Sequence, residues 1–140
     1  MDNLQTVDEL LDRLITENQV GLYYDSWLKT DPDIVMLRNR NPLIIINRNF
    51  NTKIPITYRK AHELAHILYG TLENNELYEF SPQLLQKEEV VANHGAVSIL
   101  CELIYSGMPM EERNWAKFMN AFCLPDAYQG VVKDTIELVR

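Results

Sequence analysis

The sequence predicts an α+β fold, with a small N-terminal three-stranded sheet followed by a helical half. Short runs rich in β-branched and aromatic residues occur between residues 20 and 47, whereas apolar residues recur at helical spacing from Pro55 onward. The 140 residues contain no internal repeat or Gly/Ser-rich linker, and 46% of them are hydrophobic. We therefore expect residues 1–140 to form a single domain with a sizeable core.

The sheet is expected to come from three runs, residues 20–24, 33–37 and 43–47. Residues 43–46 are all apolar, which is typical of a central strand covered on both faces. The run at 20–24 is therefore placed nearer an edge.

Five helices are expected where apolar residues recur at helical spacing between capping residues, prolines and glycines: residues 6–18, 55–69, 82–105, 110–122 and 126–138. Thr6 and Glu9 have the spacing of a capping box at the first helix. Gly70 is expected to end the second, and Ser81 to cap the third.

The charge balance argues against nucleic acid or an anionic membrane as the main partner. Twenty acidic residues against 13 Lys and Arg give a formal net charge of -7. The longest apolar run, at 43–46, is far shorter than the ~20 residues that span a bilayer. The acidic N-terminal residues lack the pattern of a secretory signal, and Cys101 and Cys123 fall in apolar surroundings typical of buried, reduced thiols. These observations predict a cytoplasmic protein.

The segment His62-Glu63-Leu64-Ala65-His66 is an HExxH motif within the second expected helix. Two histidines four residues apart lie about 40° apart around a helix, so both can bind one metal ion. Glu63 then stands beside the metal and can accept a proton from water. The motif therefore predicts a zinc site with a general base, although Mn²⁺ or Fe²⁺ would suit the same ligands.

A third ligand must come from elsewhere, because Tyr69 and Leu72 stand where the longer HExxHxxGxxH motif has Gly and His. The candidates are Glu88 and Glu89, about 100° apart on the third helix, so at most one is expected to face the metal. Glu89 shares its face with small residues that permit close packing on the motif helix, and it is the expected ligand. Glu88 is expected to be solvated, and His94 to lie at the surface or behind the ligands.

Residues 43–103 resemble the ImmA/IrrE metallopeptidases of bacteria, prophages and integrative elements. The resemblance consists of the apolar strand, the HExxH helix, and Glu89 three residues before Ala92-Asn93, with Ala96 following. Gly95 stands where the family commonly has an aromatic residue, and Ile99-Leu100-Cys101-Glu102 replaces its usual Leu-Leu-x-Pro. Both departures concern packing more than the metal ligands.

The resemblance implies a zincin-like helical half and a cytoplasmic zinc endopeptidase. In that family's terms His62, His66 and Glu89 hold Zn²⁺, Glu63 is the catalytic base, and the substrate is a helix-turn-helix repressor of phage, mobile-element or stress genes. The alternative is a non-cleaving binding module, an anti-repressor that acts by complex formation. A toxin–antitoxin component would carry the same site.

A basic segment precedes the motif. Between Asp33 and Glu63 there is no acidic residue but six basic ones: Arg38, Arg40, Arg48, Lys53, Arg59 and Lys60. This segment would either recognise an acidic stretch of a substrate or form a solvated rim. Tyr58, Tyr69 and Tyr78 are close to the motif in sequence, and any of them could donate a hydrogen bond to an oxyanion.

Overall fold

Three strands form a small mixed sheet in the computed structural model, which describes residues 4–36, 41–70 and 82–140, with only the backbone at 82–85. β1 (Gly21–Asp25) pairs in parallel with β3 (Leu43–Asn47), and β2 (Ile34–Met36) pairs antiparallel with the other edge of β3. The resulting order, β1-β3-β2, confirms the predicted central and edge strands.

Only one face of β3 is fully covered. Ile44 and Ile46 are completely buried in the core, whereas Leu43 and Ile45, which point to the opposite face, are half-buried. The prediction of a strand covered on both faces was therefore too strong.

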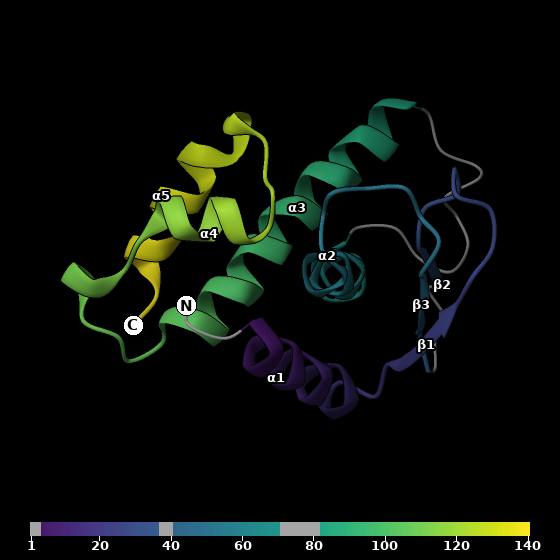
Figure 1. Cartoon of the computed structure of the whole chain (residues 1–140), viewed down its shortest axis with the longest axis horizontal. Helices are drawn as coiled ribbons and strands as arrows, with labels where there is room; N and C mark the ends of the chain where they lie inside the picture. The colour runs from purple at the N-terminus through teal and green to yellow at the C-terminus, as the bar shows by residue number, and fades with distance from the viewer. Residues whose placement is uncertain (1–3, 37–40, 71–81) are drawn as a thin grey trace.

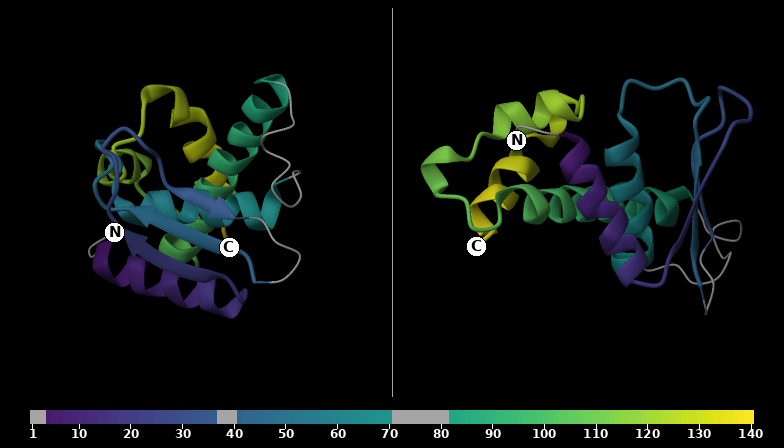
Figure 2. Two further views of the ribbon diagram at one scale, coloured as in Figure 1. Left: turned by 90° about the vertical axis from the view of Figure 1, so that its right-hand side faces the viewer. Right: turned by 60° about the horizontal axis from the view of Figure 1, so that its bottom comes forward.

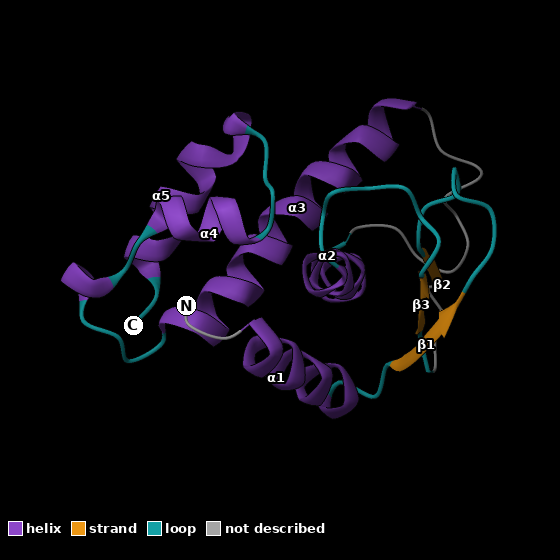
Figure 3. Ribbon diagram, in the orientation of Figure 1, coloured by secondary structure: helices purple, strands orange, loops and turns teal. Residues whose placement is uncertain are grey.

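The HExxH helix α2 (Ile56–Tyr69) lies between the sheet and α3 (Pro82–Tyr105), and Figure 1 shows it nearly end-on. α1 (Leu4–Glu17) contacts both helices and β1. α4 (Trp115–Ala121) and α5 (Gln129–Leu138) lie on the side of α3 away from the sheet (Figure 2). All described strands lie between α1 and α2 in the chain, and Figure 3 shows them gathered in one sheet beside the helices, so the α+β class is confirmed. None of the described helices is long and apolar enough to cross a bilayer.

Small side chains allow α2 and α3 to approach closely. Ala65 on α2 and Ala92, Gly95 and Ala96 on α3 are all buried. A Cβ atom at Gly95 would lie 2.8 Å from the Cβ of Ala65 and 2.6 Å from the ring of Tyr69, closer than packed atoms come. Glycine at this position is therefore a requirement of the helix contact, which accounts for the absence of an aromatic side chain.

Helix boundaries differ from the prediction in α1 and in the two helices expected over 110–122 and 126–138. α1 begins at Leu4, so Thr6 lies inside the helix rather than at its cap. The expected helix over 110–122 is broken into the short 3₁₀ turn η2 (Met110–Glu112) and α4. Ser81, the expected cap of α3, falls outside the described residues.

The break has a physical cause at Arg113 and Asn114. The Asn114 side chain accepts a hydrogen bond from the backbone N–H of Lys117, which caps α4. The Arg113 guanidinium donates to the carbonyls of Ile136 and Val139 at 2.7 and 2.6 Å, at the end of α5. Leaving the helix thus lets residue 113 satisfy carbonyls that would otherwise have no partner. A second 3₁₀ turn, η3 (Asp126–Tyr128), leads directly into α5.

The two cysteines differ in their surroundings, and both are free thiols. Cys101 is buried as predicted, and burial raises the pKa of its thiol to about 12. Cys123 is exposed in a left-handed turn after α4, with φ 53°, so the prediction of a buried thiol there was wrong.

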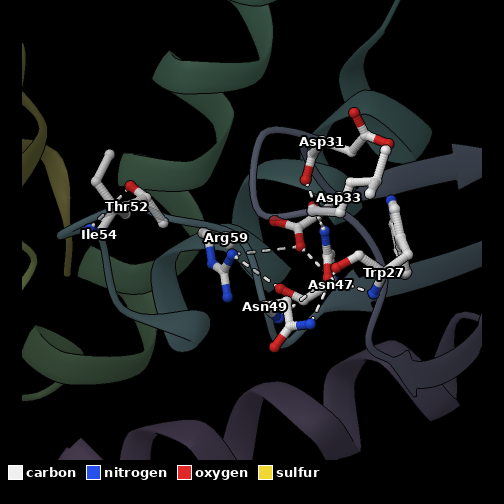
Figure 4. Close-up of polar contacts among 9 residues, drawn as sticks. Trp27, Asp31, Asp33, Asn47, Asn49, Thr52, Ile54 and Arg59 are labelled. Carbon is white, nitrogen blue, oxygen red and sulfur yellow. Dashed lines mark hydrogen bonds and ion pairs between the residues drawn. The ribbon is translucent and has the colours of Figure 1, made fainter.

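Asn47, fully buried at the end of β3, fixes the loop between β1 and β2 (Figure 4). Its side-chain amide donates to the carbonyls of Leu28 and Asp31 at 2.9 and 2.8 Å. Its Oδ1 accepts from the backbone N–H groups of Trp27 and Asn49 at 3.1 and 3.0 Å. One side-chain amide therefore satisfies four backbone groups, three in the loop between β1 and β2 and one just after β3.

We expect Asn47→Ala to lower the free energy of unfolding by about 2–4 kcal/mol, because it leaves buried donors and acceptors without partners. Urea denaturation of the purified chain measures this. Asn49→Ala is the control: its exposed side chain makes a single hydrogen bond to Trp27, and it should cost under about 1 kcal/mol. Equal losses in the two variants would show that Asn47 has no special role.

Candidate metal centre

Three side chains with ligand atoms converge where α2 meets α3. His62 and His66 project from α2 toward Glu89 of α3, and one ligand atom from each residue lies within 4.8 Å of the others. The Nε2 atoms of His62 and His66 are 3.0 and 3.1 Å from the two carboxylate oxygens of Glu89. The structure therefore brings together the three residues that the sequence analysis selected as ligands.

The far nitrogen of each imidazole is held by another residue of α3. His62 Nδ1 is 2.9 Å from Oδ1 of Asn93, and His66 Nδ1 is 3.2 Å from Oε1 of Glu88. Because these oxygens act as acceptors, each Nδ1 carries the proton and donates it. Each Nε2 is then the nitrogen available to a metal, and a histidine that donates its other N–H to such a partner is the usual arrangement at metal sites.

The position of Glu88 corrects the prediction that it is solvated. Only 1% of Glu88 is exposed, and it lies on the stripe that continues through Ala92, Gly95 and Ala96 against α2. The spacing of four, seven and eight residues from Glu88 was readable in the sequence, but the small residues were assigned to the face of Glu89, which Ala92, Asn93 and Ala96 follow at three, four and seven residues. Both carboxylates reach His66, from opposite sides of its ring.

Gly70 makes room for the Glu88 carboxylate. A Cβ atom at position 70 would lie 2.1 Å from Glu88 Oε1, so any side chain there would displace the carboxylate. Gly70 does end α2 as predicted, but its φ of -65° is one that any residue adopts. The glycine is therefore needed for this close approach and not for a left-handed turn.

The donor set fits a zinc ion. Two ligand atoms bound about 2.0–2.1 Å from a tetrahedral zinc lie ~3.3 Å apart. The Nε2 to Glu89 distances of 3.0 and 3.1 Å are close to that spacing. Two imidazoles and a carboxylate are also the donors of catalytic zinc sites that keep a fourth position open. A small adjustment of side chains would thus accommodate the ion.

A cavity of about 230 Å³, which we call the metal cavity, lies beside these ligands. Its walls include His62, Glu63, Glu89, Asp33, Arg59 and Tyr128. Glu63 is 8% exposed, and burial raises its pKa to about 7, against the opposing effect of the two imidazoles. A carboxylate whose pKa lies near neutrality is suited to accept a proton and pass it on.

Asp33 and Arg59 form a buried ion pair in the wall of the metal cavity. Arg59 lies on α2, one helical turn before Glu63. Arg59 Nη1 lies 3.4 Å from Asp33 Oδ1, and the same Asp33 oxygen accepts the backbone N–H of Asn47 at 2.7 Å. Figure 4 shows this chain of contacts from β3 to α2. The backbone N–H of Asn47 therefore helps to position the cavity wall next to Glu63.

Two residues of the basic segment predicted before the motif, Arg59 and Lys60, are paired with acids. Lys60 is fully buried, donates to Asp8 at 2.9 Å and to the Tyr24 hydroxyl at 3.2 Å, and pairs with Asp12. Arg59 pairs with Asp33, and Arg38 and Arg40 fall outside the described residues. For residues 59 and 60, neither substrate recognition nor a solvated rim applies, because their charges hold α2 in place.

Tyr128 is a cavity residue that the sequence analysis missed. It comes from η3, 39 residues after Glu89, and no motif spacing connects the two. Burial and the nearby Glu89 carboxylate raise the pKa of its phenol. Of the tyrosines considered earlier, Tyr58 also lines the metal cavity, Tyr69 is half exposed, and Tyr78 is outside the described residues. His94 is exposed, in agreement with the prediction.

We expect zinc binding to depend on both glutamates, to different degrees. Glu89→Ala removes a ligand and should lose stoichiometric zinc, whereas Glu88→Ala should weaken affinity by about 10–100-fold because His66 loses its hydrogen-bond acceptor. Glu88→Gln should restore most of the affinity, since its amide oxygen still accepts. Elemental analysis and chelator competition measure these effects, with exposed Glu102→Ala as control. Wild-type affinity in Glu88→Ala would contradict the role given to Glu88.

Zinc binding should also release a proton from His66. Burial lowers the pKa of this imidazole, but the hydrogen bond with Glu89 and the nearby Glu63 and Glu88 carboxylates raise it to about 9 without a metal. His66 is therefore protonated at pH 7, and zinc must displace about one proton from it. Affinity should rise with pH up to about 9. Calorimetry at pH 7 in buffers of different ionisation enthalpy measures the proton count, and no dependence on the buffer would contradict the expectation.

The same shift makes the metal-free fold pH-dependent. A raised folded-state pKa contributes stability that is complete below the unfolded value of 6.5 and is lost as pH rises through about 9. Glu89 behaves in the opposite way: its contacts with His62 and His66 hold its pKa well below the usual value. Its contribution is lost only in acid.

Comparison with known proteins identifies no relative from which a function could be inferred. No protein-family model matches the chain, and no curated protein or solved structure is significantly similar to it. The functional argument therefore depends on the residues described above.

Proposed function

We propose that this chain is a zinc-dependent endopeptidase with a zincin-like helical half. The observation that carries the proposal is the convergence of His62, His66 and Glu89 beside the metal cavity, which Glu63 also lines. Two imidazoles and a carboxylate supply a catalytic type of donor set, and a buried carboxylate next to it supplies a base. The resemblance of residues 43–103 to ImmA/IrrE metallopeptidases points to the same activity.

The residues divide the chemistry between them. Zinc, when bound by His62, His66 and Glu89, polarises the scissile carbonyl and makes water more acidic. Glu63 accepts the proton of the attacking water and returns it to the leaving amine, and its pKa of about 7 suits both transfers. Asn93 and Glu88 hold the imidazoles so that Nε2 faces the ligand position. Tyr128 brings a phenol donor to the cavity wall, where an oxyanion would form.

The substrate in this proposal is a helix-turn-helix transcriptional repressor, as the family resemblance implies. Cleavage would relieve repression of phage, mobile-element or stress genes, and it places the enzyme in the cytoplasm, where such a repressor acts. The net charge of -7 argues against direct contact with nucleic acid, so the effect on transcription passes through the protein partner.

One observation favours the alternative, a binding module that holds a repressor without cutting it. Gly95 stands where the resembled family commonly has an aromatic residue, and Ile99-Leu100-Cys101-Glu102 replaces its usual Leu-Leu-x-Pro, so the helix that carries Glu89 packs differently from that of the cleaving family. The alternative predicts that repressor control is independent of Glu63.

Glu63→Gln separates the two functions. The substitution removes the base but none of the ligands, so cleavage should fall by at least ~100-fold while zinc content is unchanged. His66→Ala should lose both. Cleavage is measured on a mixture of random-sequence peptides by mass spectrometry, with the zinc-loaded full chain.

Glu102→Gln is the matched control, because Glu102 is exposed on α3 outside the metal cavity and should cut as the wild type does. Undiminished proteolysis in Glu63→Gln would eliminate the proposed mechanism. A wild-type chain that binds zinc but cuts nothing would favour the binding module.

A further inference from the structure

A second, smaller cavity continues from the metal cavity between α3 and the start of α5. Its volume is about 140 Å³, and Val90, Asn93, His94, Ala127, Tyr128 and Val131 line it. Asn93 and Tyr128 also line the metal cavity, so the two hollows share a wall. We call the smaller one the side cavity.

The inner surface of the side cavity is mainly apolar. Val90 on α3 and Val131 on α5 face it, and Ala127 stands at its exposed edge. Val90 is 50% exposed, which leaves a valine side chain in contact with water beside the proposed catalytic centre. Asn93, in the shared wall, is already engaged by His62 Nδ1 and by the Tyr58 hydroxyl. The exposed His94 is the other polar residue of α3 in the lining, whereas the two valines and Ala127 offer apolar contact. The ligand should therefore be a mainly apolar group.

The volume limits what this group can be. Apolar cavities of about 150 Å³ accommodate one benzene ring. The side cavity, at about 140 Å³, is of the same size and would hold one aromatic ring or one branched aliphatic group. It is too small for a helix or a second protein surface, whereas a single side chain of an extended polypeptide fits.

We propose that the side cavity is the subsite that binds a leucine- or phenylalanine-class side chain next to the scissile bond. A polypeptide lying across the metal cavity advances about 3.3–3.6 Å per residue, so a residue flanking the reacting carbonyl would carry its side chain over the shared wall. This inference rests on the proposed peptidase function, because it assigns the specificity of that same site. Selection arises from apolar burial and size, not from charge.

Two variants alter the subsite without touching metal ligands or base. Ala127→Phe adds a ring at an exposed position on the rim and should fill the cavity. Val90→Asp places a carboxylate on its wall, at a half-exposed position where folding tolerates it. Leu138→Asp is the matched control: it makes the same kind of change on α5, at a residue that is 81% exposed and outside the side cavity.

The first measurement is the cleavage pattern on the mixture of random-sequence peptides. The wild type and Leu138→Asp should cut with Leu or Phe preferred at least ~10-fold over Gly at one position flanking the bond. Ala127→Phe should lose this preference and still cut peptides with Gly or Ala there. Val90→Asp should shift the preference toward Lys or Arg. Cleavage without an apolar preference, or one unchanged in both variants, overturns the subsite and leaves the peptidase proposal standing.

The second measurement does not need cleavage. N-acetyl-phenylalaninamide should shift the backbone ¹H–¹⁵N NMR signals of Val90, Ala127 and Val131 in the zinc-loaded wild type, and N-acetyl-lysinamide should not. The shifts should disappear in Ala127→Phe and persist in Leu138→Asp. Saturable shifts in a chain that cuts no peptide would retain an apolar site and refute the peptidase, whereas no shifts at these residues would refute the subsite.

Discussion

Glu88, Ala92, Gly95 and Ala96 form one stripe along α3 that lies against α2, and the candidate metal centre depends on this close contact. With no side chain at residue 95, the Ala65 segment of α2 comes near enough for α3 to reach both imidazoles. A larger residue at 95 would push the helices apart and move Glu88, Glu89 and Asn93 away from their partners together. The geometry of the ligands is therefore a consequence of helix packing, and ligand and packing residues alternate along one helix.

Polar contacts hold the opposite side of α2. Lys60 ties it to α1 through Asp8, and Arg59 ties it to the strands through Asp33 and the carbonyl of Asn47. Buried charges of this kind contribute little net stability, but removing one partner is costly, so they favour a single arrangement. α2 is thus fixed on the sheet side and the α3 side at once. Such fixation is what a general base needs, because its distance from the reacting atoms must not vary.

The sequence was sufficient where a local pattern decides the structure, and insufficient where distant residues decide it. The HExxH spacing placed His62, Glu63 and His66 correctly on one helix, and the apolar run at 43–46 identified the central strand. Glu88 was misjudged because the face of small residues on α3 was assigned to Glu89, although Glu88 shares it. The space that Gly70 leaves for the Glu88 carboxylate is a tertiary contact that no local pattern reveals. Tyr128 could not be found at all, since only the tertiary fold brings η3 to the metal cavity. Similarly, the helix expected over 110–122 is interrupted at Arg113, whose guanidinium donates to carbonyls 23 and 26 residues later, and no local pattern predicts these contacts.

Glu89 contacts both imidazoles, so metal binding, protonation and the positions of the two rings all depend on this one carboxylate. The Glu89 carboxylate lies between the two rings and raises the pKa of His66, and its contacts with both Nε2 atoms keep the rings close together. A metal ion that bound here would replace the proton on His66, so a positive charge would still face Glu89 and the side chains would need to move little. Glu63 lies outside these pairs, and its proton affinity is set mainly by burial. Under the proposed function, the ligands would exchange a proton for a cation while a separate carboxylate stays free to move protons during the reaction, and this separation of roles is what the proposed catalytic centre requires.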